Sequence, residues 1–212
     1  MLELGIKLIL AYLLGSLSGA LLLGRAYGID LRTVGSGNAG ATNAMRAKGP
    51  GFAFWVILID TLKGVIAVTL IATAQLPVVP VDPELPHAWF APMCGVAVVL
   101  GHVYPWWFEL RGGKGAATLL GVCGALAPEL IIPVLLVWGL TLSVTGYVSL
   151  ATVLAAAIAP VYVAVALHDP PLLVFCVVMA CFIAYTHRAN LARLRAGTED
   201  RKERAMLWRR KS

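Results

Sequence analysis

The sequence predicts an all-α protein embedded in a membrane. Hydrophobic residues make up 59% of the 212 residues and charged residues only 13%, and the mean hydropathy is +0.83. Soluble domains are typically about 45–50% apolar, so this composition excludes an ordinary soluble domain. Because a backbone inside a bilayer must satisfy its own hydrogen bonds, the long apolar runs are expected to form helices. We expect a helical membrane domain over residues 1–187 and a basic cytoplasmic tail over 188–212.

The chain has seven apolar runs, and all but one are long enough, or nearly so, to be membrane spans. A transmembrane helix needs about 20 residues, with about 17–25 as the usual range. The first run lacks the features of a cleavable signal and is interpreted as a span. The run over 115–127 is short, and is either a crossing helix or a re-entrant half helix. The seven runs cover residues 4–24, 52–74, 88–104, 115–127, 130–146, 148–167 and 171–187.

The distribution of lysine and arginine decides between these alternatives. Nine of the 17 lysines and arginines lie between Arg188 and Lys211, and the loops at 75–88, 128–129 and 168–170 contain none. If all seven runs cross the membrane, every basic loop lies on one face, as the positive-inside rule requires. We therefore expect seven spans, with the N-terminus outside and the C-terminus in the cytoplasm.

The basic tail is expected to contact the membrane surface. A cluster of cations beside a span is attracted to anionic lipids by about 1 kcal/mol per cation. Aromatic residues are not interleaved with these cations, apart from Trp208, so we expect no nucleic-acid partner. The cations concerned are Arg201, Lys202, Arg204, Arg209, Arg210 and Lys211.

A run of glycine and short polar residues follows the first span. It reads G-S-G-N-A-G-A-T-N from Gly35 to Asn43, and Arg46 lies three residues beyond it. Such a run can turn six backbone N–H groups and several short side chains toward one anion, beside a permanent cation. The alternative is a plain turn before a helix that Thr42 or Asn43 caps. The residues that we expect to bind substrate here are Gly35, Gly37, Asn38, Gly40, Thr42 and Asn43.

A second glycine motif opens the fourth apolar run. Gly112-Gly113-Lys114-Gly115 comes directly before a predicted helix, and N–H groups at a helix N-terminus beside a lysine form a phosphate site. The alternative is a glycine turn whose lysine only follows the positive-inside rule. We expect Lys114 and the three glycines to bind phosphate.

Neither glycine motif is a nucleotide site. The first satisfies G-x-G-x-x-G, and Asp60 lies twenty residues after Gly40, but a dinucleotide fingerprint must follow a β-strand and this motif follows a membrane helix. In the second, Gly115 stands where a Walker A loop needs serine or threonine, and Phe108 stands where its first glycine belongs. Phosphate binding without nucleotide hydrolysis is therefore expected.

Two further polar clusters fall on the same predicted face. One is Tyr147-Val148-Ser149-Leu150, and the other begins at His187 and Asn190, which are spaced i, i+3 at the end of the last run. Imidazole exchanges protons near neutral pH, whereas an amide can only position a group or stabilise charge. Since the loops on the opposite face carry nothing comparable, we expect one composite site that faces the cytosol.

Two charged residues lie inside the second span. Asp60 is about 12 Å from the start of this span, where an unpaired charge is expensive. Its i, i+3 spacing from Lys63 favours a structural ion pair over a proton relay or a substrate contact. His102 lies in the third span, and its packing and active-site interpretations both stay open. The four cysteines show no spacing typical of a disulfide or zinc site, so no metal is expected.

The four clusters together resemble the bacterial acyl-phosphate:glycerol-3-phosphate acyltransferase family. The matching motifs are G-S-G-N-x-G-A-T-N followed by Arg46, G-H-x-x-P with G-G-K-G-x-A-T, Y-V-S-L, and H-R-x-N with R-L-x-x-G-T-E. The resemblance implies a seven-helix enzyme of the bacterial inner membrane. It would transfer a fatty acyl group from acyl phosphate to the 1-hydroxyl of glycerol 3-phosphate, giving lysophosphatidic acid and phosphate in the first committed step of phospholipid synthesis.

The resemblance also implies roles for individual residues and partners. Ser36, Arg46, Lys114, His187 and Asn190 are the expected catalytic residues. Acyl phosphate, glycerol 3-phosphate and membrane lipids are the expected partners of a monomeric enzyme without cofactors, because acyl phosphate is already activated. The residues expected to bind substrate by this resemblance are Gly112, Gly113, Gly115 and Ser149.

The proton acceptor is not obvious from the sequence. Neither His102 nor His187 is followed five residues later by the aspartate that other glycerolipid acyltransferases use. We expect the hydroxyl proton to pass to the phosphate of the acyl donor, with His187 as the alternative base or an orienting group.

The sequence also departs from the family pattern, and other classes of protein stay open. Thr186, Ala189 and Gly146 stand where the family usually has other residues, and Gly146 replaces an arginine. We expect Arg188 or Arg193 to compensate for this missing cation. The alternatives are a carrier of an anionic phosphate compound, which should show repeated halves, and a regulator that binds lipid through its tail.

Overall fold

The computed structural model describes residues 1–76, 79 and 86–207, and this part of the chain is entirely helical or irregular. The all-α class is therefore confirmed. The expectations for Trp208, Arg209, Arg210 and Lys211 lie outside the described residues. The chain divides into two compact units, Met1–Leu126 and Ala127–Ser212. The predicted membrane domain over 1–187 and cytoplasmic tail over 188–212 stay a prediction. Each unit is described by itself.

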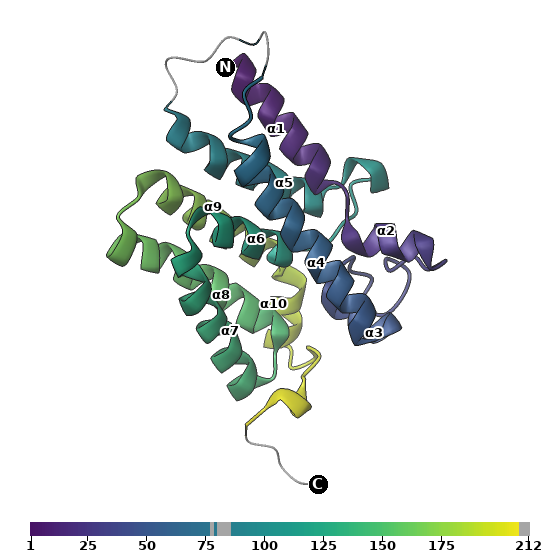
Figure 1. Ribbon diagram of the computed structural model, residues 1–212. Helices are drawn as coiled ribbons and strands as arrows, with labels where there is room; N and C mark the ends of the chain where they lie inside the picture. Colours follow the sequence, from purple (N-terminus) through teal and green to yellow (C-terminus); the bar gives the residue numbers. More distant parts are fainter. Residues whose placement is uncertain (77–78, 80–85, 208–212) are drawn as a thin grey trace. The chain divides into compact units, whose positions relative to one another are not determined.

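The first unit is built from six α-helices and short extensions of them (Figure 1). Helix α1 packs against α5, while α2, α3 and α6 pack against α4. One π-helical turn, η1, extends α4, and short 3₁₀ turns, η2 and η3, flank α5. The bounds are α1 Leu2–Gly15, α2 Gly19–Ala26, α3 Ala41–Lys48, α4 Pro50–Ile66, η1 Ala67–Ile71, η2 His87–Trp89, α5 Phe90–Val103, η3 Trp106–Phe108 and α6 Ala116–Leu126.

The second unit is a set of antiparallel apolar helices followed by a short amphipathic one. Helix α8 packs against both α7 and α9. Helix α9 starts sharply, because Asp169 accepts a hydrogen bond from the Leu172 amide at 3.0 Å and two prolines follow it. The bounds are η4 Pro128–Leu130, α7 Ile131–Thr145, α8 Val148–Tyr162, η5 Val163–Leu167, α9 Pro170–Thr186, α10 Arg188–Arg195 and η6 Glu203–Ala205.

Several helices are long and apolar enough to cross a bilayer. Among the described residues, four meet both criteria, and two bent pairs, α1 with α2 and α9 with α10, raise the number to six if each pair is one span. The bends are 43° and 58°. Helix α6 is apolar but has only 11 residues, short of the roughly 20 that a span needs. A multi-pass membrane protein is therefore supported, and seven spans remain a prediction.

The first predicted span is not one continuous helix. Helix α1 ends at Gly15 and α2 begins at Gly19, so the chain bends by 43° inside the run predicted over 4–24. Hydropathy alone cannot reveal such a break, because the residues on both sides of it are apolar.

Close backbone contacts fix the helices of the first unit. A Cβ atom on Gly101 of α5 would meet the Tyr12 carbonyl of α1, and a Cβ atom on Gly121 of α6 would meet the Thr61 carbonyl of α4. Small residues let helices approach this closely in membranes, where packing rather than water exclusion holds them together. The first unit is therefore a tightly packed scaffold for the loops that leave it.

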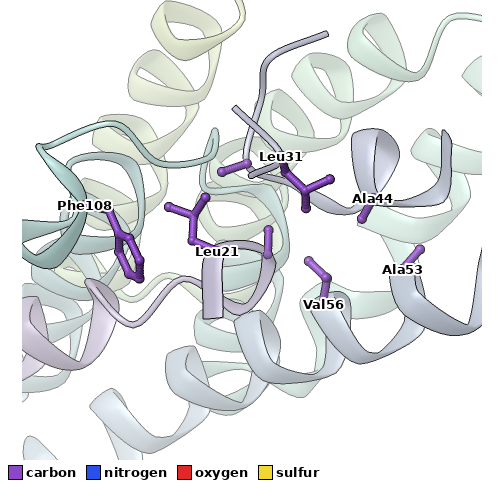
Figure 2. Packing of buried hydrophobic residues seen from close by; sticks show 8 residues of the cluster. Leu21, Leu31, Ala44, Ala53, Val56 and Phe108 are labelled. Carbon is purple, nitrogen blue, oxygen red and sulfur yellow. The ribbon is translucent and has the colours of Figure 1, made fainter. Parts of the chain in front are cut away.

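A cluster of buried apolar side chains anchors the loop that follows α2. Leu31 in this loop is fully buried, as is Val56 of α4, and Phe108 of η3 joins them (Figure 2). Burying one such leucine side chain contributes about 1.5–3 kcal/mol. The first glycine loop is therefore attached at its root to α2, α3 and α4. The buried members are Ala20, Leu21, Leu31, Ala39, Ala44, Ala53, Val56 and Phe108.

Candidate functional site

Asn43 holds the first glycine loop together. It lies in the first turn of α3 and is almost completely buried. Its Nδ2 donates to the carbonyls of Leu31 and Val34, both at 2.9 Å, and its Oδ1 accepts from the Ser36 amide at 3.0 Å. Gly35 has φ +58°, and a Cβ atom there would meet Asn43 Oδ1. Its described contacts hold the loop, and the expectation that Asn43 binds substrate stays a prediction.

The loop offers fewer anion-binding amides than its sequence suggests. The Ser36 amide binds Asn43, the Gly37 amide donates to Val34 at 3.1 Å, and the Gly40 amide donates to Asn38 at 2.9 Å. The Asn43 amide donates to the Gly40 carbonyl at 3.1 Å. An open arrangement of six inward amides is therefore wrong, because a short loop with a buried root satisfies much of its own backbone.

The loop instead ends at a helix N-terminus. Helix α3 starts at Ala41 behind the extended residue Gly40, and no side chain caps it. Neither Thr42 nor Asn43 is the N-cap residue, so the alternative of a helix capped by one of them is also wrong. The amides of the first helical turn and the positive end of the helix dipole are suited to an anion. Ser36, Gly37 and Thr42 are exposed in this region, and Arg46 lies exposed further along α3.

Arg32 links the loop that follows α2 to η3, which precedes the second glycine loop. Arg32 Nη2 lies 2.8 Å from Asp30 Oδ2, and Arg32 Nη1 donates to the Phe108 carbonyl at 3.1 Å. The hydrogen bond from Arg32 lowers the pKa of Asp30 below its ordinary value. Arg32 was not among the predicted site residues. Its i, i+2 spacing from Asp30 in a loop was the only available signal.

The second glycine loop folds back onto the end of α5. The Gly112 amide donates to the Val103 carbonyl at 3.1 Å, and the Gly113 amide donates to the His102 carbonyl at 3.2 Å. Gly115 has φ +90°, and its carbonyl accepts from Leu119 at 2.8 Å, so it marks the start of α6. This loop also leads directly into a helix N-terminus.

The two glycine loops touch each other. Gly113 is buried, and a Cβ atom on it would meet both the Ala39 carbonyl of the first loop and His102 Nε2 of α5. Ala39 lies two residues before α3, and Gly113 lies three residues before α6. The two helix N-termini therefore start close to one contact point. Lys114 is half-buried beside this contact.

In the second unit, Glu199 accepts hydrogen bonds from several of the predicted polar residues. Its Oε1 accepts from Ser149 Oγ at 2.8 Å and from Asn190 Nδ2 at 2.6 Å. Its Oε2 accepts from Arg193 Nε at 2.8 Å. Burial opposes the charge of Glu199, but the hydrogen bonds from Asn190, Ser149 and Arg193 outweigh it, and the pKa of this carboxyl is lowered below its ordinary value.

The local sequence explains how Glu199 returns to these partners. Helix α10 ends with Gly197 at φ +70°, the Thr198 amide donates to Arg193 at 2.9 Å, and the Gly197 amide donates to Leu194 at 3.1 Å. This pair of bonds is a Schellman motif, which reverses the chain at a helix end. Glu199 was absent from the predicted site. Its role was only weakly indicated by its position, two residues after the helix-ending Gly197 in a basic tail.

His187 lies buried where α9 gives way to α10. Its Nδ1 is 2.8 Å from the Ile183 carbonyl, so a neutral ring carries its proton on Nδ1 to donate this bond. The lone pair of the ring then belongs to Nε2. This arrangement suits an orienting group or a base.

The cation next to Gly146 is Arg201. Arg201 Nε donates to the Thr145 carbonyl at 3.0 Å, and its guanidinium lies 5.7 Å from the centre of the Tyr147 ring. The expected substitutes have other contacts: Arg193 binds Glu199, and Arg188 stacks on Tyr185 at 4.2 Å. Arg201 of the tail therefore places a cation beside Gly146.

The predicted site residues are divided between the two units. The first unit holds Ser36, Arg46 and Lys114, and the second holds Ser149, His187 and Asn190. Among the described residues, no group of three or more His, Cys, Asp and Glu side chains is arranged to hold a metal ion. The remaining predicted residues lie on the two glycine loops and comprise Gly35, Gly37, Asn38, Gly40, Thr42, Asn43, Gly112, Gly113 and Gly115.

The fold is that of an integral membrane protein in which two glycine loops each lead into a helix N-terminus. The family model described as glycerol-3-phosphate acyltransferase matches residues 5–197, and the chain belongs to this family. Similar relatives carry the same description. The protein of Geotalea daltonii is 41% identical over 190 residues, covering 90% of this chain and 93% of the relative. The protein of Aquifex aeolicus is 40% identical over 193 residues, covering 91% and 96%.

Two solved structures share the fold. The glycerol 3-phosphate form of PlsY, an integral membrane glycerol 3-phosphate acyltransferase, matches with a TM-score of 0.81 and 37% identity. The lysophosphatidic acid form matches with a TM-score of 0.80 and 35% identity. Each match covers 93% of this chain and 94% of the solved chain. The chain is therefore an acyltransferase of the membrane.

The charge of Glu199 should stabilise the protein only above acidic pH. The pKa of Glu199 is lower in the folded state than in the unfolded state. Its contribution to the free energy of unfolding is therefore fully present above the unfolded pKa of about 4.3, and is lost as pH falls through the folded pKa. We expect the difference in Tm between the parent and Glu199→Gln to be largest at pH 6–7 and to shrink below about pH 4. Glu203→Gln, at an exposed position in the same tail, is the control and should leave the Tm profile unchanged. Parallel profiles for the parent and Glu199→Gln would contradict this role.

Proposed function

We propose that this acyltransferase uses acyl phosphate as its donor and gives lysophosphatidic acid and inorganic phosphate. The observation that carries the proposal is the contact between Ala39 and Gly113. It joins two glycine loops that each lead into a helix N-terminus, in a chain of the glycerol-3-phosphate acyltransferase family. Two anionic substrates need two such anion-binding elements close together.

The reaction needs positioning more than activation. The 1-hydroxyl oxygen of glycerol 3-phosphate attacks the acyl carbon, the bond from this carbon to the phosphate oxygen breaks, and the hydroxyl proton leaves with the released phosphate. Acyl phosphate is a mixed anhydride, so this step needs no nucleotide, coenzyme A or metal. The protein must hold two anions that repel each other and stabilise the developing oxyanion. Oriented amides and fixed cations supply this stabilisation.

In the first unit, the two glycine loops are proposed to bind substrate. Ser36, Arg46 and the start of α3 would bind one phosphate-bearing group, and Lys114 with the start of α6 would bind the other. In the second unit, Ser149 and Asn190, both held by Glu199, are proposed to contact substrate. A Cβ atom on Gly35, Gly112 or Gly113 would meet neighbouring atoms, and Gly115 has a positive φ, so larger residues would not suit these four positions.

The proposed location is the bacterial inner membrane, with the site on the cytoplasmic face. Seven spans with the N-terminus outside place all basic loops inside. In a variant with its four native cysteines replaced, a cysteine at Lys202 should react with a membrane-impermeant thiol reagent only after the cells are opened. A cysteine at His87, which lies in the predicted outer loop at 75–88, should react in intact cells. Labelling of the Lys202 position in intact cells would reverse the orientation.

Purified monomeric protein incubated with palmitoyl phosphate and glycerol 3-phosphate should release phosphate and lysophosphatidic acid in equal amounts. Arg46→Ala or Ser36→Ala should lower kcat/KM by about 10²–10³, as loss of an oxyanion-stabilising donor does. Lys48→Ala is the matched control, because this exposed cation on α3 lies 6.0 Å from the Tyr27 ring and has no proposed substrate contact. Phosphate release without glycerol 3-phosphate would indicate a phosphatase, and binding without turnover would indicate a carrier.

His187 is proposed to orient substrate rather than to accept the proton. Its Nδ1 contact with Ile183 fixes the ring, and the phosphate leaving group is itself a base. His187→Ala should therefore keep measurable turnover, and kcat/KM should keep the pH dependence of the parent enzyme. A loss of about 10²–10⁴ together with disappearance of the acidic limb near pH 6.5 would make His187 an obligatory base.

A further inference from the structure

Three charged or titratable side chains form a buried cluster between α4 and α5. Lys63 Nζ lies 3.0 Å from Asp60 Oδ1 and 2.9 Å from His102 Nδ1. His102 Nδ1 lies 3.4 Å from Asp60 Oδ1. Each of these residues is at most 3% exposed. The predicted ion pair between Asp60 and Lys63 is therefore confirmed, and His102 is its third member.

The ion pair binds both ends of the break between α1 and α2. Lys63 Nζ donates to the carbonyls of Gly15 at 2.8 Å and Leu17 at 3.3 Å. On the other side, the Gly19 amide at the start of α2 donates to Asp60 Oδ1 at 3.1 Å. A helix C-terminus carries partial negative charge and a helix N-terminus partial positive charge. The cation thus lies at the end of α1 and the anion at the start of α2, which matches the dipoles of both helices.

His102 connects this cluster to the glycine loops. Its Nδ1 faces Lys63, and its Nε2 lies against Gly113 at the point where a Cβ atom would also meet the Ala39 carbonyl. Its backbone carbonyl accepts the Gly113 amide at 3.2 Å. His102 therefore contacts the buried ion pair through Nδ1, and it lies against the junction of the two loops through Nε2.

We propose that Asp60, Lys63 and His102 form a positioning cluster that sets the distance between the two anion-binding loops. The ion pair fixes the direction in which α2 leaves α1, and α2 leads into the first loop. His102 fixes the second loop through Gly113. The cluster touches no proposed substrate group, so it acts through the loops and governs the affinity for glycerol 3-phosphate. This inference rests on the proposed function.

The two ring nitrogens of His102 can be tested separately. In His102→Asn the side-chain oxygen reaches the position of Nδ1 and keeps a partner for Lys63, but nothing replaces Nε2 beside Gly113. In His102→Gln the amide reaches the position of Nε2. We expect His102→Asn to raise the KM for glycerol 3-phosphate at least tenfold with kcat within threefold of the parent, and His102→Gln to return KM to within threefold.

A second buried ion pair in the same unit provides the control. Lys7 Nζ lies 2.8 Å from Glu3 Oε1, donates to the Ala72 carbonyl at 2.8 Å and lies 4.9 Å from the centre of the Phe90 ring. It contacts α1, the end of α4 and α5 rather than the loops. Lys7→Met should lower Tm while leaving KM for glycerol 3-phosphate within twofold. A tenfold rise in KM for this variant would show that general destabilisation explains the His102 effect, and would overturn the proposal.

A binding measurement keeps the test independent of turnover. The rise in Tm that saturating glycerol 3-phosphate produces in the parent protein should be at least halved in His102→Asn and restored in His102→Gln. An unchanged KM, or an unchanged rise in Tm, in His102→Asn overturns the positioning role. Absence of turnover in the parent protein despite this rise in Tm would overturn the proposed function instead, so the two failures are distinguishable.

Discussion

A helix that breaks inside an apolar environment must have its end groups bound by the protein, and the first unit is organised around this constraint. The carbonyls at the end of α1 and the amide at the start of α2 have no water to bind. Lys63 and Asp60 supply the missing partners from the neighbouring helix. The ion pair of Asp60 and Lys63 binds the backbone groups at the break between α1 and α2. Because α2 leads into the first glycine loop, this ion pair also determines where that proposed anion-binding loop lies.

Acidic side chains near an anion site are tolerated only where cations or other donors neutralise them. Asp30 pairs with Arg32, Asp60 pairs with Lys63, and Glu199 is held by Arg193 and two neutral donors. Since each carboxylate is compensated locally, these carboxylates do not oppose the phosphate binding that is proposed for the loops. The same three carboxylates also fix backbone or side-chain positions, which accounts for acidic residues in an otherwise basic region.

The sequence predicted features that depend on local spacing. Apolar runs predicted the helices, the i, i+3 spacing predicted the Asp60 pair with Lys63, and the glycine motifs predicted the loops. The bend at Ser16, the loop-holding role of Asn43 and the gathering role of Glu199 were not predictable. These features depend on contacts between residues far apart in the chain, such as Ser149 with Glu199. Composition also cannot decide how an 11-residue apolar helix such as α6 meets the membrane.

An activated donor changes which residues matter in an acyltransferase. When the leaving group needs no help from a metal or a protonated side chain, most of the catalytic effect must come from orientation, and a misplacement of 1 Å can lower a rate about 100-fold. Residues that hold the loops then influence the reaction as strongly as residues that touch substrate. Asn43, His102 and Glu199 all have this character, because each bridges segments that carry proposed substrate contacts. Buried polar residues in this protein are therefore better understood through the loops that they fix than through direct chemistry.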